Sequence, residues 1–188
     1  MPTQIGYYDK LKSVAGKILT FLHTLTLDGV DGKTVTVNDD CSIGGNAVNP
    51  TLPAFQANPS SAQLDIAAGG FVTVVFGTEV FDQGSNFASN TFTAPVTGKY
   101  LLSVSLYLTN IDTASSDITL AIVTTNRSYY NVFDPSKFSA DLPYATMQMV
   151  ILADMDASET AYVQIRQTGG ANQMDISTSS FFCGYLVC

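Results

Sequence analysis

The fold class of this 188-residue chain is decided by the stretch Phe92-Thr93-Ala94-Pro95-Val96-Thr97-Gly98-Lys99-Tyr100-Leu101-Leu102-Ser103-Val104-Ser105-Leu106-Tyr107-Leu108. From Tyr100 to Leu108 every second residue is large and apolar, and Ser103 and Ser105 stand between them. This period of two is typical of a β-strand with one buried face. A slip of one residue would place both serines in the core, so the pattern specifies the register of this strand.

The chain from residue 63 onward repeats this pattern in short runs that turn residues separate. The other runs are 71–76, 118–123, 147–152, 161–166 and 181–187. Short strands at intervals of roughly 8 to 12 residues are typical of an antiparallel sandwich, whereas a parallel sheet would need crossover helices between its strands. The sequence therefore predicts an all-β antiparallel sandwich or jelly roll for this part of the chain.

Residues 1–50 are predicted to form a separate N-terminal arm. Apolar residues recur there at alternating steps of three and four, at Tyr8, Leu11, Ala15, Ile18, Leu22 and Leu25. This spacing predicts a short helix with an apolar seam, which is stable only when it packs on a partner surface or on copies of itself. A plain strand-rich arm is the alternative interpretation. The residues that we expect to anchor the arm are Leu11, Ile18, Leu22 and Leu25.

A β-hairpin is predicted to follow the helix. Threonine alternates with apolar residues in 24–27 and again in 33–37, and the glycine-rich turn 28–32 lies between them. Alternating runs on both sides of such a turn are typical of a hairpin. Residues 38–62 are rich in glycine, proline, asparagine and serine, so we expect a linker that leads into the jelly roll.

The composition excludes several classes of function. Charged residues make up 13% of the chain, against about 25% in an average soluble domain, and the formal net charge is −8. An acidic chain repels phosphate groups, so we expect neither nucleic-acid binding nor a basic anchor on anionic lipid. No apolar run approaches the roughly 20 residues that span a bilayer, and no secretory signal is expected. The low charge indicates surfaces that assembly covers.

The sequence offers little catalytic chemistry, and we expect no enzymatic activity. His23 is the only histidine and lies in the arm, away from the predicted jelly roll. The three cysteines Cys41, Cys183 and Cys188 have no metal-type spacing, so free thiols are expected instead of a disulfide framework or a zinc site.

Two polar or aromatic segments leave alternatives open. Asp154, Asp156 and Glu159 lie close together and are either calcium ligands or the solvated acids of a hairpin turn. Tyr129, Tyr130 and Phe133 are predicted to form an aromatic-rich loop. That loop either anchors on the core or binds a partner or a sugar.

Three segments carry a resemblance to a known family. They are Phe81-Asp82-Gln83-Gly84-Ser85-Asn86-Phe87 leading into Asn90-Thr91-Phe92-Thr93-Ala94-Pro95-Val96-Thr97-Gly98-Lys99-Tyr100, the apolar–acidic–apolar hairpin 147–165, and Ser179-Ser180-Phe181-Phe182-Cys183-Gly184-Tyr185-Leu186-Val187. In this order they resemble the globular head shared by complement component 1q and tumour necrosis factor. The resemblance covers about residues 51–188.

The resemblance implies a jelly roll that forms a compact homotrimer and acts as a binding head, not as an enzyme. The sequence alone does not say which face of each strand points to the trimer axis. The aromatic residues that we expect at the trimer interface are Tyr100, Tyr107, Phe182 and Tyr185.

The arm resembles a different group of proteins. There is no collagen-like stalk, and 25–37 is similar to repeat units of bacteriophage fibre and virion-surface proteins. We therefore expect a homotrimeric capsid decoration protein or short head fibre on the virion surface, whose arm binds capsid or other virion proteins. The alternative is a tail-fibre tip or surface adhesin that binds a host receptor or glycan.

Overall fold

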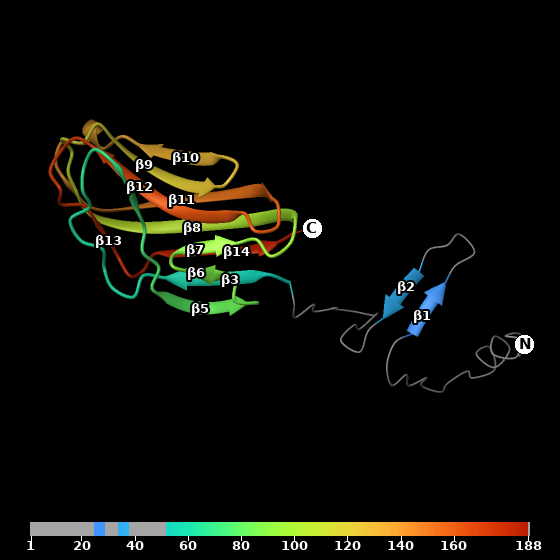
Figure 1. The fold of residues 1–188 in the computed structure, drawn as a ribbon. Helices are drawn as coiled ribbons and strands as arrows, with labels where there is room; N and C mark the ends of the chain where they lie inside the picture. The colour runs from blue at the N-terminus through green and yellow to red at the C-terminus, as the bar shows by residue number, and fades with distance from the viewer. Residues whose placement is uncertain (1–24, 29–33, 38–51, 188) are drawn as a thin grey trace, which may run out of the picture. The chain divides into compact units, whose positions relative to one another are not determined.

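The computed structural model describes residues 25–28, 34–37 and 52–187, and the chain divides into two compact units, residues 1–49 and 50–188 (Figure 1). In the first unit, β1 (Leu25–Asp28) pairs antiparallel with β2 (Thr34–Val37). The predicted hairpin is confirmed. Leu25 pairs with Val37 as the first residue of β1. The predicted helix therefore does not extend to Leu25. Leu11, Ile18, Leu22 and His23 lie outside the described residues.

The second unit, here called the head, consists of two antiparallel sheets, and the jelly-roll prediction is confirmed (Figure 1). The first sheet has the order β11-β8-β14-β3-β5, and β13 also pairs with β8. Its strands are β3 (Ala54–Asn58), β5 (Thr78–Gln83), β8 (Gly98–Ile111), β11 (Leu142–Met155), β13 (Asp175–Ile176) and β14 (Phe181–Leu186).

The second sheet has the order β10-β9-β12-β7-β6, and β4 also pairs with β12. Its strands are β4 (Phe71–Thr73), β6 (Phe87–Ala88), β7 (Thr91–Thr93), β9 (Asp117–Thr124), β10 (Ser128–Phe133) and β12 (Thr160–Thr168). A single turn of 3-10 helix, η1 (Pro135–Lys137), precedes β11. Among the described residues no helix has the length and apolar character needed to cross a membrane.

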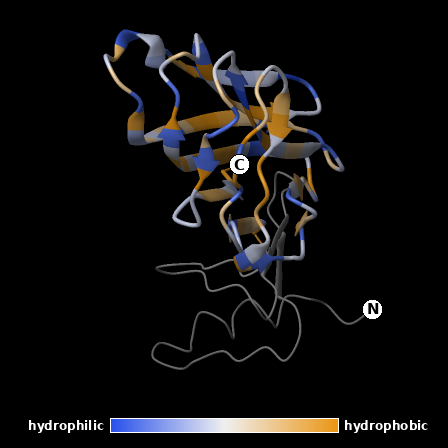
Figure 2. Cartoon of the chain, turned by 90° about the vertical axis from the view of Figure 1, so that its left-hand side faces the viewer, coloured by the Kyte–Doolittle hydropathy of each residue, from blue (hydrophilic) through white to orange (hydrophobic). Residues whose placement is uncertain are grey.

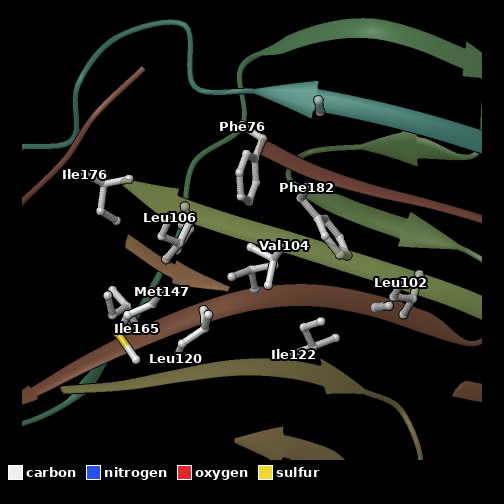
Figure 3. Close-up of a cluster of buried hydrophobic side chains, with 14 of the residues drawn as sticks. Phe76, Leu102, Val104, Leu106, Leu120, Ile122, Met147, Ile165, Ile176 and Phe182 are labelled. Carbon is white, nitrogen blue, oxygen red and sulfur yellow. The ribbon is translucent and has the colours of Figure 1, made fainter. Parts of the chain in front are cut away.

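The core lies between the two sheets, and β8 supplies its central row (Figure 3). The alternate residues of β8 that the sequence placed on one face are all buried, with at most 1% of their surface exposed: Tyr100, Leu102, Val104, Leu106 and Leu108. Leu120, Ile122 and Ile165 of the second sheet are also fully buried in this core. Because residues alternate along each strand, Figure 2 shows apolar and polar segments side by side within the sheets.

One end of the core is aromatic. The ring of Phe55 in β3 stacks on Phe87 and Phe92 at centroid distances of 4.9 and 4.7 Å, and Phe182 meets it edge-on at 5.0 Å. Stacked and edge-to-face pairs of this kind add about 0.5–1.5 kcal/mol each beyond the burial of their area. This cluster joins β3 and β14 of the first sheet to β6 and β7 of the second.

Two segments differ from the sequence prediction. The predicted linker 38–62 contains β3, which pairs with both β14 and β5 and buries Phe55 and Ala57. Its five residues are too few to show a period among the surrounding turn-forming residues. The predicted aromatic loop around Tyr129 is strand β10, whose residues pair with β9 along their whole length.

Strand β14 packs tightly against this core at Gly184. A Cβ atom at Gly184 would lie 2.6 Å from Leu102 Cδ2, 2.9 Å from Phe55 Cε1 and 3.0 Å from the Leu101 carbonyl oxygen. We therefore expect Gly184→Ala to lower the free energy of unfolding by about 1–3 kcal/mol through overpacking, as measured by urea denaturation. Gly70→Ala is the control, because no heavy atom lies within 4 Å of its added Cβ. Equal losses in both variants would contradict this packing.

Candidate assembly interface on the first sheet

Strand register determines which residues of the first sheet point away from the core. Residues directly opposite each other on antiparallel strands point to the same side. Beside Leu101 and Ser103 of β8, the pairing therefore defines two outward rows. The first row is Leu152, Leu101, Tyr185, Ala54 and Gln83, and the second row is Val150, Ser103, Cys183, Gln56 and Phe81. We call these two rows the outer face of the first sheet.

The outer face exposes large apolar side chains. The exposed fraction is 62% for Val150, 59% for Leu152, 49% for Tyr185 and 47% for Phe81. Further along β11, Tyr144 is also exposed, and its ring stacks on that of Tyr107 at 6.2 Å. Several exposed large apolar side chains on one sheet face are typical of a site of protein–protein contact.

Neither row contains a charged residue. The nearest ion pair, between Lys99 and Asp154, lies at the end of β8 and β11 beyond the first row. The hydrogen bond and charge of Lys99 lower the pKa of the Asp154 carboxyl. Within the second row, burial raises the pKa of the Cys183 thiol, so that side chain is uncharged at neutral pH. Depletion of charge together with exposed Tyr and Phe is the composition of an interface core.

The prediction of a trimer interface is wrong for two of the four residues. Tyr100 and Phe182 have no exposed surface. The Tyr100 hydroxyl donates a hydrogen bond to the Val96 carbonyl at 2.7 Å, and Phe182 packs against Phe55. Both side chains are occupied within one head and cannot reach a second copy.

Tyr107 and Tyr185 both point outward from the first sheet, because each follows a buried residue on its strand and successive residues of a strand point to opposite faces. Their place at a trimer interface stays a prediction. Val150, Leu152 and Phe81 were missed. Residues 149–152 of β11 are all apolar, so this run has no period that would reveal which of its two faces is exposed.

The acidic turn between β11 and β12 is held by hydrogen bonds. Asp154 is paired with Lys99, Asp156 Oδ1 accepts from Thr97 Oγ1 at 3.3 Å, and Glu159 Oε2 accepts the Asp156 backbone N–H at 2.9 Å. In the part of the chain that the structure describes, no group of three or more His, Cys, Asp or Glu residues is placed to hold a metal ion. The three acids are thus engaged in separate contacts instead of one ligand set.

Of the three cysteines, only Cys183 belongs to the described residues. Cys183 is free and half-buried on the outer face, whereas Cys41 and Cys188 lie outside the described residues.

The geometry defines a jelly-roll head with one uncharged face suited to assembly. Residues 54–187 match the family model of the C1q domain, and the chain belongs to this family. The expected resemblance to complement component 1q and tumour necrosis factor is confirmed. Domains of this class typically form homotrimers and generally act as binding or structural modules.

Solved structures show the same fold at low sequence identity. The globular domain of zebrafish complement 1qA protein matches with a TM-score of 0.52 and 14% identity, over 73% of this chain and 98% of that chain. Murine APRIL at pH 8.5 matches with a TM-score of 0.50 and 12% identity, over 72% of this chain and 99% of that chain. A search of curated proteins finds no match.

A pair of matched variants tests the outer face as the interface. We expect Val150→Asp to dissociate the trimer, because each interface would bury a carboxylate without a partner. Val132→Asp is the control, since Val132 is 61% exposed but belongs to β10 of the second sheet. Sedimentation velocity should find Val132→Asp trimeric and Val150→Asp monomeric, with similar circular dichroism. A trimeric Val150→Asp protein would show that the interface lies elsewhere.

Proposed function

We propose that the protein is a non-enzymatic structural protein of a bacteriophage virion. In this proposal three chains form a capsid decoration protein or a short head fibre on the virion surface. The N-terminal unit attaches the trimer to the particle, and the three heads face outward.

The observation that carries the proposal is the hairpin β1–β2 in a unit of its own before the head. Its strands, Leu25–Asp28 and Thr34–Val37, have the alternating threonine and apolar sequence that resembles phage fibre repeats. An isolated two-stranded hairpin is at best marginally stable in water, which favours its packing against another protein. Capsid proteins, or the same unit in neighbouring copies, are the partners that the proposal supplies.

The geometry of the head supports an outward-facing arrangement. Ala54 at the start of β3 pairs with Tyr185 near the end of β14, and the Leu186 N–H donates to the Pro53 carbonyl at 3.0 Å. The chain therefore enters the head at the same end at which it leaves. Three heads side by side would bring their chain-entry points together at one end and leave the opposite end of each head free.

The charge distribution fits a crowded particle surface. Residues 51–188 contain four basic and eleven acidic side chains, a net charge of −7, whereas residues 1–50 carry a net charge of −1. Like-charged heads repel one another and also repel nucleic acid. The acid excess thus keeps neighbouring trimers apart while the uncharged outer face is covered within each trimer.

An adhesin that binds a host receptor or glycan is the second candidate, and a cluster on the second sheet favours it. The Tyr130 ring, 58% exposed, lies 6.1 Å from Phe71, and the Arg166 guanidinium lies 4.9 Å above the Phe71 ring. Exposed aromatic and arginine side chains are the residues that dominate binding energy in interfaces.

Particle composition tests the proposed function. Mass spectrometry of purified virions should detect the full-length protein, and a chain that lacks residues 1–49 should form trimers but should not be incorporated. Absence of the full-length protein from intact virions would contradict the proposal, as would equal incorporation of the truncated head.

Host adsorption separates the two candidates. Virions that carry the Tyr130→Ala variant should adsorb to host cells at the same rate as unmodified virions if the protein is a decoration. A large loss of adsorption with unchanged incorporation would favour the adhesin.

A further inference from the structure

A pocket of about 280 Å³ opens at the end of the head away from the point at which the chain enters. Its lining residues are Asn110, Asp141, Leu142, Pro143 and Gln173. Strand β8 begins beside the end of β14 and finishes at Ile111 opposite Leu142, so the pocket lies at the free end of the first sheet. Three segments far apart in the sequence, near residues 110, 141 and 173, meet there.

Hydrogen bonds fix the polar side chains of this pocket. Asp141 Oδ1 accepts from both the backbone N–H and the hydroxyl of Thr113, each at 2.9 Å. Asp141 Oδ2 accepts one longer bond from Gln173 Nε2, at 3.3 Å. Asn110 Nδ2 donates to Asp175 Oδ2 at 2.8 Å. The remaining side-chain oxygens of Asn110 and Gln173 are hydrogen-bond acceptors.

The pocket carries negative charge that the described residues do not neutralise. The hydrogen bonds from Thr113 hold the pKa of Asp141 below its ordinary value, so its carboxylate is charged at neutral pH. The Asp112 carboxylate near this end of the head accepts the backbone N–H groups of Ala114 and Ala171, at 2.8 and 2.6 Å. The ion pairs within the described ranges use other acids, namely Asp154, Asp134 and Asp117. A carboxylate in a recess without a cation favours a positively charged ligand.

We propose that this pocket binds a small ligand with a protonated primary amine beside hydroxyl groups, which is the chemistry of an amino sugar. The ammonium group donates to Asp141 Oδ2, and the hydroxyl groups donate to the side-chain oxygens of Asn110 and Gln173. Leu142 and Pro143 supply apolar surface for the ring. The volume is slightly below the range of roughly 300–1,000 Å³ for drug-sized ligands and suits a single ring.

This inference goes beyond the proposed function, because it depends only on the free end of the head and not on the particle that carries it. It is also separate from the aromatic cluster of the second sheet. A divalent cation is a poorer occupant, because the described residues provide no group of three acids, histidines or cysteines around one point.

Calorimetric titration of the full-length protein with glucosamine, at a slightly acidic pH that keeps the amine protonated, tests the ligand class. N-acetylglucosamine and glucose are the matched probes, since each lacks the charge. We expect both to bind at least tenfold more weakly than glucosamine, and we expect the lysine analogue Nα-acetyl-lysine, which lacks the hydroxyl groups, to bind more weakly as well. Failure of glucosamine to bind, or equal affinity for any of the other three, would overturn the proposal.

Variants assign the binding to the pocket. Asp141→Asn keeps the shape of the side chain and should weaken glucosamine binding by about tenfold or more, as expected for loss of a charged hydrogen-bond partner. Asp134→Asn is the control, because Asp134 is a half-buried acid outside the pocket that accepts the Ser136 N–H. Gln173→Ala decides the matter if Asp141→Asn melts at a lower temperature than the wild type. Unchanged affinity in a folded Asp141→Asn or Gln173→Ala protein would overturn the proposal.

Discussion

The alternation of side chains along β8 is the constraint on which the rest of the head depends. One set of its residues, from Tyr100 to Leu108, fills the space between the two sheets and is fully buried. The intervening residues, such as Leu101 and Ser103, therefore point away from the core. Because β11 and β14 pair with the two edges of β8, the same alternation also decides which of their residues face outward. The register of β8 with its neighbours thus determines both the core and the proposed interface.

The period of two was enough to predict an all-β head, because strands such as β8 and β12 alternate clearly. It was not enough where both faces of a strand are apolar. In 181–186 the outward residues Phe181 and Tyr185 alternate with the buried Phe182, so the sequence could not tell an interface aromatic from a core aromatic. Strand β3 escaped prediction for another reason. Its position between β14 and β5 depends on partners that are 20 or more residues away in the chain.

The two candidate sites of the head differ in how far the sequence could reveal them. The low content of charged residues, 13%, indicated that assembly covers apolar surface, although it did not say where that surface lies. The pocket at the free end of the first sheet left no such signal in the sequence. Its residues Asn110, Asp141 and Gln173 are about 30 residues apart, and they meet only through the β8–β11 pairing and the neighbouring loops. A face follows from a local pattern, whereas a pocket depends on the full topology.

The uncharged outer face of the first sheet is expected to be covered by two further copies of the chain. Native mass spectrometry of the full-length protein across a dilution series measures this directly. The predicted result is one species at three times the 20.0 kDa chain mass, persisting as the protein is diluted. A folded species at the mass of a single chain would contradict the expected trimer, because the exposed Val150, Leu152 and Tyr185 would then have no partner to cover them.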